Sequence, residues 1–379
     1  MADNKIIEVL IFGIEVGKLG YDLDKDTSYF QYNPSFLGSN RYSKLFPFIF
    51  KRNKAVQVFT NYGGETFRGL PPMIADSLPD VFGNIIFKKW LESKNRNFEK
   101  ITPIEQLCYV ANRGMGALEY RPAKELPKSN EINIEEIADI LNQVLDLKAE
   151  TSEQSLNEDA LLNIFKMGTS AGGLRPKILV SEHINSGKII PGDLVYSSDY
   201  NHYLVKLCLN EENSKEYNKE KIEYAYYLMA KAAGIQMMPS KLINDKHFAT
   251  VRFDRQNGEK QHVLTASGLT GWNYKNPEES SYENVFELAL GLKVPFKDLK
   301  ELYRRMIFNL VVANTDDHLK NHSFIYDKKN NSWNIAPAYD LTYPLNINLN
   351  FTKVSRALSI NNKRSGISIK DLLSLAETF

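Results

Sequence analysis

The most regular hydrophobic pattern in the chain lies between residues 299 and 311. Its apolar residues recur at intervals of three and four positions; they are Leu299, Leu302, Tyr303, Met306, Ile307, Leu310 and Val311. This spacing places them on one face of an α-helix. We therefore predict a buried central helix, which ends at the five polar residues 314–318 (NTDDH) and holds them in one place.

Shorter patterns predict the remaining elements. Helices are predicted at residues 84–94, 134–147, 157–167 and 222–233, the last of them ended by Gly234. Runs of β-branched and aromatic residues predict strands at 6–15, 28–33, 177–181, 202–208 and 247–254, and a hairpin made of 323–326 and 333–336. The stretches 17–26, 121–135 and 210–221 are polar or rich in turn residues, so we predict loops there.

Composition narrows the class of protein. Of the 379 residues, 43% are hydrophobic and 25% are charged, which is typical of a globular protein and excludes a disordered or fibrous chain. The length favours one bilobal unit or two to three packed domains. The formal net charge of +1 provides no global field that would recruit nucleic acid or an anionic membrane.

The two cysteines and the N-terminus indicate the compartment. Cys108 and Cys208 lack the paired spacing of a metal site or a disulfide framework, so we expect two buried thiols in a reducing cytoplasm. The N-terminus lacks the features of a signal peptide, and no apolar run approaches the roughly 18 residues of a membrane span. We therefore expect a cytoplasmic protein with no membrane partner.

Candidate chemistry follows the predicted central helix. Asp316 precedes Asn321 by five positions, the spacing found in the catalytic loop of protein kinases, where the aspartate accepts the hydroxyl proton and the asparagine holds Mg²⁺. That spacing selects Asp316 over Asp317. Asp340 follows the predicted hairpin and would return beside this loop as a metal ligand. The structural alternative is an Asp-Asp-His cluster that only caps or solvates a helix end.

A lysine and a glutamate upstream strengthen the kinase interpretation. Lys206 interrupts an apolar strand, and Glu223 lies seventeen residues later, near the start of a predicted helix. In kinases such a lysine binds the α- and β-phosphates while a helix glutamate orients it. The alternative is an edge-strand lysine that faces water, but the apolar neighbours favour a buried strand and a lysine that needs a partner.

A glycine-rich segment, residues 168–177 (GTSAGGLRPK), lies between a predicted helix and a predicted strand. Its glycines allow backbone amides to approach phosphate oxygens closely. It is not a Walker loop, because the Gly-Lys-Ser/Thr ending is absent. A purely structural connection is the alternative, although Arg175 and Lys177 add positive charge.

Several short motifs occur in an order that resembles the HipA family, the kinase toxins of bacterial toxin–antitoxin modules. They are residues 78–80 (LPD), 114–117 (GMGA), 170–177 (SAGGLRPK), Lys206, 252–255 (RFDR), 316–321 (DDHLKN) and 339–340 (YD). The resemblance covers most of the chain. It implies an α+β, bilobal, protein-kinase-like fold with an extra small β-rich subdomain and a mostly helical C-terminal lobe. It places the N-terminal subdomain at 1–122, the kinase N-lobe at 123–251 and the C-lobe at 252–379.

The resemblance also implies roles for individual residues. Asp316 would be the catalytic base, Asn321 and Asp340 the Mg²⁺ ligands, and Ser170 an autophosphorylation site, with Thr169 as the alternative acceptor. A phosphate on Ser170 would repel anionic ATP and draw the glycine-rich loop away. The residues implied in nucleotide binding are Gly172, Gly173, Lys177, Lys206, Glu223, Val251, Phe253, His318, Asn321, Tyr339 and Asp340.

The chain departs from the family pattern at three positions. Asp317 stands where a glycine usually follows the catalytic aspartate, and it adds a negative charge near the expected metal site. Val251 replaces a glutamate found in many relatives, and Leu174 replaces a small residue of the glycine-rich loop. Members of the family usually continue beyond a point like Phe379, so further helices are expected past it.

The function expected from the sequence is a serine/threonine protein kinase that uses ATP and Mg²⁺. By family analogy its target would be a translation component such as an aminoacyl-tRNA synthetase, and its partner a HipB-like DNA-binding antitoxin through which nucleic acid is contacted only indirectly. Two alternatives stay open. One is a catalytically silent, antitoxin-binding co-repressor, and the other is a small-molecule phosphotransferase on the same fold.

Overall fold

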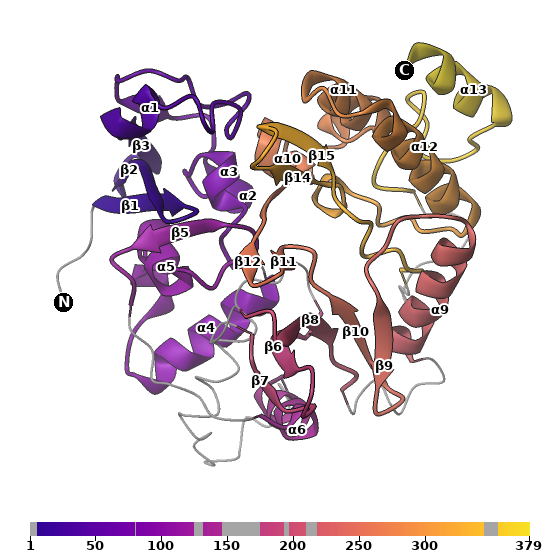
Figure 1. Ribbon diagram of the computed structural model, residues 1–379, viewed down its shortest axis with the longest axis horizontal. Coiled ribbons are helices and arrows are strands. Elements are labelled where there is room, and N and C mark those ends of the chain that lie inside the picture. The colour runs from indigo at the N-terminus through magenta and orange to yellow at the C-terminus, as the bar shows by residue number, and fades with distance from the viewer. Residues whose placement is uncertain are drawn as a thin grey trace.

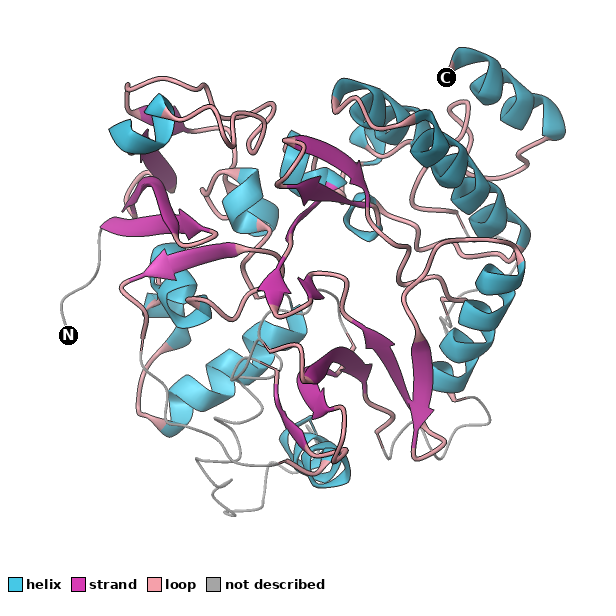
Figure 2. Cartoon of the chain, viewed as in Figure 1, coloured by secondary structure: helices cyan, strands magenta, loops and turns pink. Residues whose placement is uncertain are grey.

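The computed structural model describes residues 6–79, 81–124, 132–145, 175–192, 197–209, 218–344 and 355–379. These residues form three antiparallel sheets with helices around them, together with a two-stranded ribbon (Figures 1 and 2). This arrangement of helices and strands is the predicted α+β class. Within the described residues, no helix combines the length with the apolar composition needed to cross a bilayer.

The N-terminal sheet has five strands in the order β4-β3-β2-β1-β5. These strands are β1 (Ile6–Ile11), β2 (Ile14–Asp22), β3 (Thr27–Tyr32), β4 (Gln57–Phe59) and β5 (Leu118–Arg121). Short helices surround the sheet; they are α1 (Pro34–Gly38), α2 (Gly64–Phe67), α3 (Pro72–Ala75), α4 (Val81–Ser93), the 3-10 helix η1 (Phe98–Lys100) and α5 (Pro103–Val110). The predicted helix 84–94 and strand 28–33 are confirmed.

Two predictions for this sheet are wrong. The run 6–15 is not one strand, because Phe12 and Gly13 adopt positive φ angles of 50° and 76° and turn the chain into a hairpin. Residues 17–22 are not a loop, because β2 continues through them. Gly17 belongs to the strand because it passes close to β3, where a Cβ atom would collide with the carbonyl oxygen of Gln31.

The second sheet has the order β7-β6-β8-β10-β9. Its strands are β6 (Lys177–His183), β7 (Ile189–Pro191), β8 (Tyr200–Lys206), β9 (Ser240–Ile243) and β10 (His247–Val251). Helices α4 and α6 (Ile134–Leu145) share a hydrophobic core with this sheet that contains Phe87, Leu141, Ile178 and Val205. Helix α9 (Lys219–Ala232) contacts β9 and β10.

The strands predicted at 177–181, 202–208 and 247–254 and the helices predicted at 134–147 and 222–233 are confirmed within a few residues. Helix α9 begins at Lys219, inside the predicted loop 210–221, because the Asn218 side chain caps it by accepting from the Lys221 amide at 2.8 Å. The predicted helix 157–167 and most of the predicted loops 121–135 and 210–221 lie outside the described residues.

The C-terminal part combines a small sheet with helices. It contains the ribbon β11 (Arg255–Gln256) and β12 (Glu259–Lys260), the sheet of β13 (His262–Thr265), β14 (Ser323–Asp327) and β15 (Ser332–Ile335), the helices α10 (Ala266–Thr270), α11 (Tyr282–Gly291), α12 (Phe296–Val311) and α13 (Ile369–Thr378), and the 3-10 helices η2 (Pro277–Glu279) and η3 (Leu319–Asn321). The predicted hairpin and central helix are confirmed. Only one face of α12 is buried, since Leu302 and Met306 are 0% exposed but Val311 is 76% exposed.

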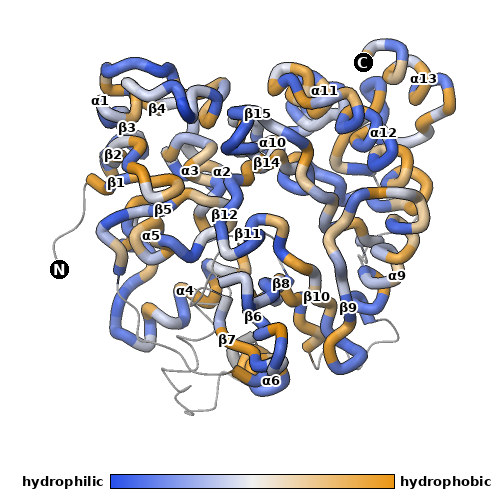
Figure 3. Tube along the Cα trace, in the orientation of Figure 1, coloured by the Kyte–Doolittle hydropathy of each residue, from blue (hydrophilic) through white to orange (hydrophobic). Residues whose placement is uncertain are grey.

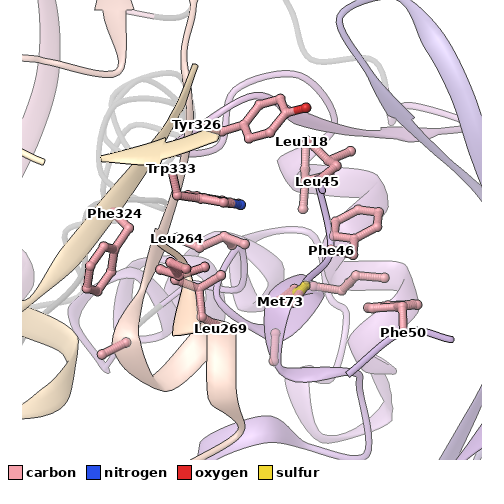
Figure 4. Close-up of a cluster of buried hydrophobic side chains, with 14 of the residues drawn as sticks. Leu45, Phe46, Phe50, Met73, Leu118, Leu264, Leu269, Phe324, Tyr326 and Trp333 are labelled. Carbon is pink, nitrogen blue, oxygen red and sulfur yellow. The ribbon is translucent and has the colours of Figure 1, made fainter. Parts of the chain in front are cut away.

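The largest hydrophobic core joins the two ends of the chain. Figure 4 shows Leu45, Phe46 and Met73 from the N-terminal region facing Leu264, Phe324 and Trp333 from the C-terminal region. Trp333 also donates from its indole nitrogen to the carbonyl of Lys44 at 2.8 Å. Each large apolar side chain buried here contributes about 1.5–3 kcal/mol. The described residues between 6 and 121 are therefore packed firmly against the C-terminal region. Figure 3 shows that hydrophobic and hydrophilic segments are interspersed along the described part of the chain.

Candidate phosphoryl-transfer site

The centre of the site is the side chain of Lys206, at the end of β8. Lys206 is 6% exposed, and its Nζ donates to Glu223 at 2.7 Å (Oε1) and 2.8 Å (Oε2) and also to Oδ1 of Asp340. Glu223 lies in the first turns of α9, and Asp340 follows β15. Three segments that are far apart in the sequence therefore meet at one ammonium group.

A second lysine lies beside the first. Lys177 of β6 is directly opposite Lys206 in the strand register, and it is 4% exposed. Arg175 adds a third cation, which pairs with Glu220 at 2.9 Å and with Glu223 at 3.6 Å. Like charges on facing strand positions repel one another, so this corner of the protein is suited to binding a polyanion such as a triphosphate.

Lys206 and Asp340 keep each other in the charged forms that phosphate and metal binding require. Burial by itself lowers the pKa of Lys206, but the Asp340 and Glu223 carboxylates more than compensate, and the pKa lies above its ordinary value. Burial raises the pKa of Asp340, but Lys206 and Lys177 outweigh it and hold that pKa well below the usual range. At neutral pH the lysine is therefore a cation and Asp340 an anion.

The loop after α12 brings the second aspartate to the cleft. The Asn321 side chain donates from Nδ2 to the carbonyl of Asp316 at 2.8 Å, which closes the loop upon itself. The Asp316 side chain is open to the cleft, yet partial burial of its carboxylate raises its pKa. The carboxylates of Asp340 and Asp317 raise this pKa further, and His318 lowers it only in part. A raised pKa suits a carboxylate that has to accept a proton.

Asp317, the other candidate in this loop, points away from the cleft. It is 1% exposed, accepts from the Tyr282 hydroxyl at 2.7 Å and forms a salt bridge with Arg356 at 2.8 Å. Its carboxylate is therefore paired with a cation inside the C-terminal part. Of the two aspartates, the geometry leaves Asp316 as the one able to meet a substrate.

The path of the chain before Asp340 fixes where its carboxylate lies. The Ala338 amide donates to the carbonyl of Gln236 at 2.8 Å, and Arg305 donates to the carbonyl of Ala336 at 2.9 Å. Asp340 itself has a φ angle of +56°, in the left-handed region. Such a conformation is costly for a residue with a Cβ atom and is often retained at functional sites.

Two of the proposed nucleotide contacts are aromatic and lie together. The rings of Phe253 and Tyr339 are 5.8 Å apart, and the Tyr339 hydroxyl donates to the carbonyl of Lys320 at 2.7 Å. Close by, the amides of Val251 and Arg252 are already engaged with Pro239 at 2.9 Å and with His202 at 2.8 Å. A base bound at this edge would therefore use carbonyl groups or the next amide, not these two.

His318 lies beside the same cleft. Its ring is 5.2 Å from that of Tyr274, and its Nδ1 is buried without a hydrogen-bond partner among the described residues. An orphaned buried nitrogen is rare in a folded protein. It is available to a ligand of the cleft.

The Arg-Phe-Asp-Arg motif has a structural role. Asp254 is 0% exposed and accepts from Arg252 at 2.8 and 2.9 Å, from Arg255 at 2.7 Å and from the Gly116 amide at 2.9 Å. Arg255 donates further to the carbonyls of Gly114 (2.8 Å) and Gly116 (3.0 Å). Two motifs that the sequence showed separately, 114–117 and 252–255, therefore form one buried junction.

A single cleft of about 2040 Å³ contains the described candidate residues. It is lined by Lys177, Lys206, Glu223, Val251, Phe253, Asp316, His318, Asn321, Tyr339 and Asp340. Gly172, Gly173 and Ser170, together with Thr169, lie outside the described residues. The structure thus brings together every described residue that the sequence suggested for the site.

Sequence reasoning missed Asp76, which also lines the cleft. It accepts from the amide and the hydroxyl of Thr265 at 2.8 and 2.9 Å, and Lys320 lowers its pKa although burial raises it overall. The signal was present, because Asp76 is the only charged residue in the apolar stretch 69–79. Its partners, however, are about 190 residues further along the chain.

The donor set fits a magnesium ion. Asp340 provides carboxylate oxygens and Asn321 an amide oxygen, and Mg²⁺ typically uses one or two such protein ligands together with phosphates and water. The described residues contain no group of three or more His, Cys, Asp or Glu side chains of the kind that forms an all-protein metal cage. Asp340 and Asn321 would therefore share Mg²⁺ with a bound triphosphate.

Comparison with known proteins agrees with this arrangement. Residues 7–121 match the HipA N-terminal domain, and residues 169–378 match the HipA-like C-terminal domain. A proposed kinase of Haemophilus influenzae is 28% identical over 195 residues, which cover 46% of this chain and 52% of that protein. A second proposed kinase, from Sinorhizobium fredii, is 28% identical over 99 residues, which cover 26% of this chain and 24% of that protein. The matches thus span about half and about a quarter of these relatives.

The fold also matches a solved structure. The Shewanella oneidensis HipA, in its complex with HipB and operator DNA, aligns with a TM-score of 0.65 and 18% identity over 98% of this chain and 84% of that chain. This likeness confirms the predicted bilobal, HipA-like architecture. Since one domain match alone extends over more than half of the sequence, the chain belongs to the HipA family.

Proposed function

We propose that this protein is a kinase that transfers the γ-phosphoryl group of ATP to a serine or threonine hydroxyl of a protein. The observation that carries the proposal is the contact of Lys206 with both Glu223 and Asp340, beside the loop of Asp316 and Asn321. A lysine held between a helix glutamate and a metal-binding aspartate is the arrangement that protein kinases need for phosphoryl transfer. The kinase names of the two curated relatives support it.

Each residue has a defined task in this mechanism. Lys206, oriented by Glu223, binds phosphate oxygens of ATP, and Lys177 adds a second cation at the same place. A Mg²⁺ ion held by Asp340 and Asn321 would neutralise charge on the phosphates. Asp316 orients the acceptor hydroxyl and takes its proton, and the pKa of Asp316, raised by burial and neighbouring carboxylates, favours that transfer.

Further parts of the proposal rest on the family. We infer that the protein is the toxin of a toxin–antitoxin module and acts in the cytoplasm, with a translation component as its target. The solved relative contains HipB and operator DNA, which supports a HipB-like antitoxin as partner. We also propose Ser170 as an autophosphorylation site and the division of the chain at residues 122 and 251.

The proposal is tested with purified protein, radiolabelled ATP and Mg²⁺. Mass spectrometry comes first, because a chain already phosphorylated on Ser170 would take up no label. We expect label on serine or threonine of the parent and of added protein substrates, and none with Asp316→Ala. Label that persists in Asp316→Ala, or label found only on a metabolite, would contradict the proposal. Label that persists in Ser170→Ala would reject Ser170 as the sole acceptor.

A further inference from the structure

The catalytic loop contains a buried charge that the proposed mechanism does not use. Asp317 directly follows Asp316, but its carboxylate lies inside the protein, where Oδ2 accepts from Tyr282 at 2.7 Å and from Arg356 at 2.8 Å. The side chains of Asp317 and Arg356 are 0% and 4% exposed. Removing one partner of such a buried pair leaves the other charge uncompensated, which is far more costly than losing a surface pair.

The partners of Asp317 come from two separate segments. Tyr282 is the first residue of α11, and Arg356 belongs to the segment that follows Asp340. The same segment binds the loop backbone, since the Ala357 amide donates to the carbonyl of Thr315 at 2.8 Å and Arg356 donates to the carbonyl of Asn314 at 3.2 Å. The loop 314–317 is thus bound, on the side opposite the cleft, by residues that do not line the cleft.

The network continues into α12. Asn309 donates to the Tyr282 hydroxyl at 3.0 Å, and Asn314 donates to the side-chain oxygen of Asn309 at 2.9 Å. Asn309 and Asn314 are each 1% exposed. The end of α12, the start of α11 and the loop are therefore connected by one chain of buried polar contacts.

Asp316, by contrast, has few constraints of its own. Among the described residues, its backbone carbonyl accepts a hydrogen bond from Asn321, and its carboxylate is held by none. Its direction therefore depends on how the backbone at 315–317 is held. A misplacement of about 1 Å at a reacting group can cost on the order of 100-fold in rate.

We propose that Asp317 is a positioning residue: its salt bridge with Arg356 and its hydrogen bond with Tyr282 fix the loop so that Asp316 faces the transferring phosphoryl group. The inference rests on the proposed kinase function and deepens it. It also accounts for the extra aspartate next to the expected metal site, since its carboxylate turns away from the cleft and pairs with Arg356.

The test compares variants of the full chain that differ in this pair. Asp317→Asn keeps the size of the side chain but leaves Arg356 as an unpaired buried cation, whereas Asp317→Asn combined with Arg356→Gln removes both charges. The control is Asp371→Asn, because Asp371 is also a buried aspartate, 3% exposed and paired with Lys363 at 2.8 Å. Within the described part of the chain, no hydrogen bond or ion pair joins it to residues 314–321. Three quantities are measured: the single-turnover rate at saturating ATP, the Kd for ATP, and amide hydrogen exchange at residues 314–321.

We expect Asp317→Asn to lower the rate by at least about 30-fold while the Kd for ATP changes by less than about threefold, because only the orientation of Asp316 is lost. The double variant should recover at least about fivefold of that rate. Amides at 314–321 should exchange faster in Asp317→Asn. In the control, rate, Kd and exchange should stay close to those of the parent.

Two results would overturn the inference. One is a parent-like rate in Asp317→Asn, and the other is a parallel loss of rate and ATP affinity that the control shows as well. If the parent itself transfers no phosphate, the proposed function fails, but the exchange measurement still decides this inference. Faster exchange at 314–321 in Asp317→Asn supports it, and exchange equal to that of the parent rejects it.

Discussion

Two aspartates in this protein have similar electrostatics and different surroundings. Asp254, in the junction beneath the cleft, and Asp340, in the cleft, each lie between two cations, and in each case those cations outweigh burial and hold the pKa well below its usual range. Asp254 is 0% exposed and its partners are all protein groups. The Asp340 side chain is 34% exposed and opens into the cleft.

The difference separates a structural site from a site that can bind a ligand. Asp254 has its acceptor capacity taken up by two arginines and an amide, so no ligand can reach it. Asp340 shares Lys206 with Glu223 and has room for a metal ion or phosphate to rearrange these contacts. A shifted pKa by itself therefore does not identify a functional carboxylate. The carboxylate oxygens must also be accessible to a ligand, as they are in Asp340 but not in Asp254.

The largest effect is expected at Asp340. Asp340→Asn should lower phosphoryl transfer by at least about 1000-fold, because it removes a charged metal ligand. The fold should persist, since Lys206 keeps Glu223 as its partner. Single-turnover kinetics measure the rate and circular dichroism checks the fold. Transfer within about tenfold of the parent rate would contradict the assignment.

The corresponding change at Asp254, in the buried junction of residues 114–117 with 252–255, should lower the stability of the fold. Asp254→Asn removes the negative charge that Arg252 and Arg255 both contact in a buried site, so we expect a loss of about 3–5 kcal/mol in the free energy of unfolding. Denaturant titration measures it. The low pKa of Asp254 means that its contribution is complete above about pH 4 and fades as the pH falls further, so the gap between parent and variant should narrow in acid. A gap independent of pH would argue against this assignment.

A smaller effect is expected from the partner of Lys206. Glu223→Gln keeps the shape of the side chain but not its charge, so Lys206 should turn fully toward Asp340, and kcat/KM for ATP should fall by about 10- to 100-fold. Glu135→Gln is the control, because Glu135 contacts His247 and Lys246 outside the cleft. An equal effect of both changes would mean that Glu223 has no special role.

His262, which is buried where the N-terminal and C-terminal regions pack together, should make the free energy of unfolding depend on pH. His262 is 0% exposed among Phe46, Tyr326 and Trp333, and burial lowers its pKa to about 3. The unfolded chain binds this proton near pH 6.5 and the folded one does not. Stability should therefore fall as the pH drops from about 6.5 to about 3, by up to about 1.4 kcal/mol per pH unit.

Denaturant titrations of the parent and of His262→Phe at several pH values test this expectation. The contribution should be absent from the variant, so its unfolding free energy should decline less steeply below about pH 6.5. Identical slopes in both proteins would show that His262 is not the group responsible.

The sequence revealed much of the site because kinase chemistry depends on short spacings. Asp316 and Asn321 share one loop, and Lys206 and Glu223 sit at the end of one strand and the start of the next helix, so local patterns were sufficient to find them. Asp340 also came within reach because a tight hairpin precedes it.

Features that depend on remote partners were not predictable in this way. Asp76 is bound by Thr265, and Asp317 is bound by Arg356. Both partners come from distant segments, so no local sequence pattern predicts these contacts. In the fold, the strand β2 was missed because Gly17 is a turn signal in the sequence but a close-approach residue in the sheet. In each of these cases, contacts between distant segments determined the structure, and local sequence propensity did not.

The account stands on a metal-bound triphosphate held between Lys206 and Asp340. Binding of a non-hydrolysable ATP analogue, with and without Mg²⁺, to the parent and to Asp340→Asn tests it most directly. We predict that Mg²⁺ strengthens binding to the parent by at least about tenfold, or about 1.4 kcal/mol, and leaves binding to Asp340→Asn almost unchanged. The same gain from Mg²⁺ in both proteins, or no binding to the parent, would contradict it.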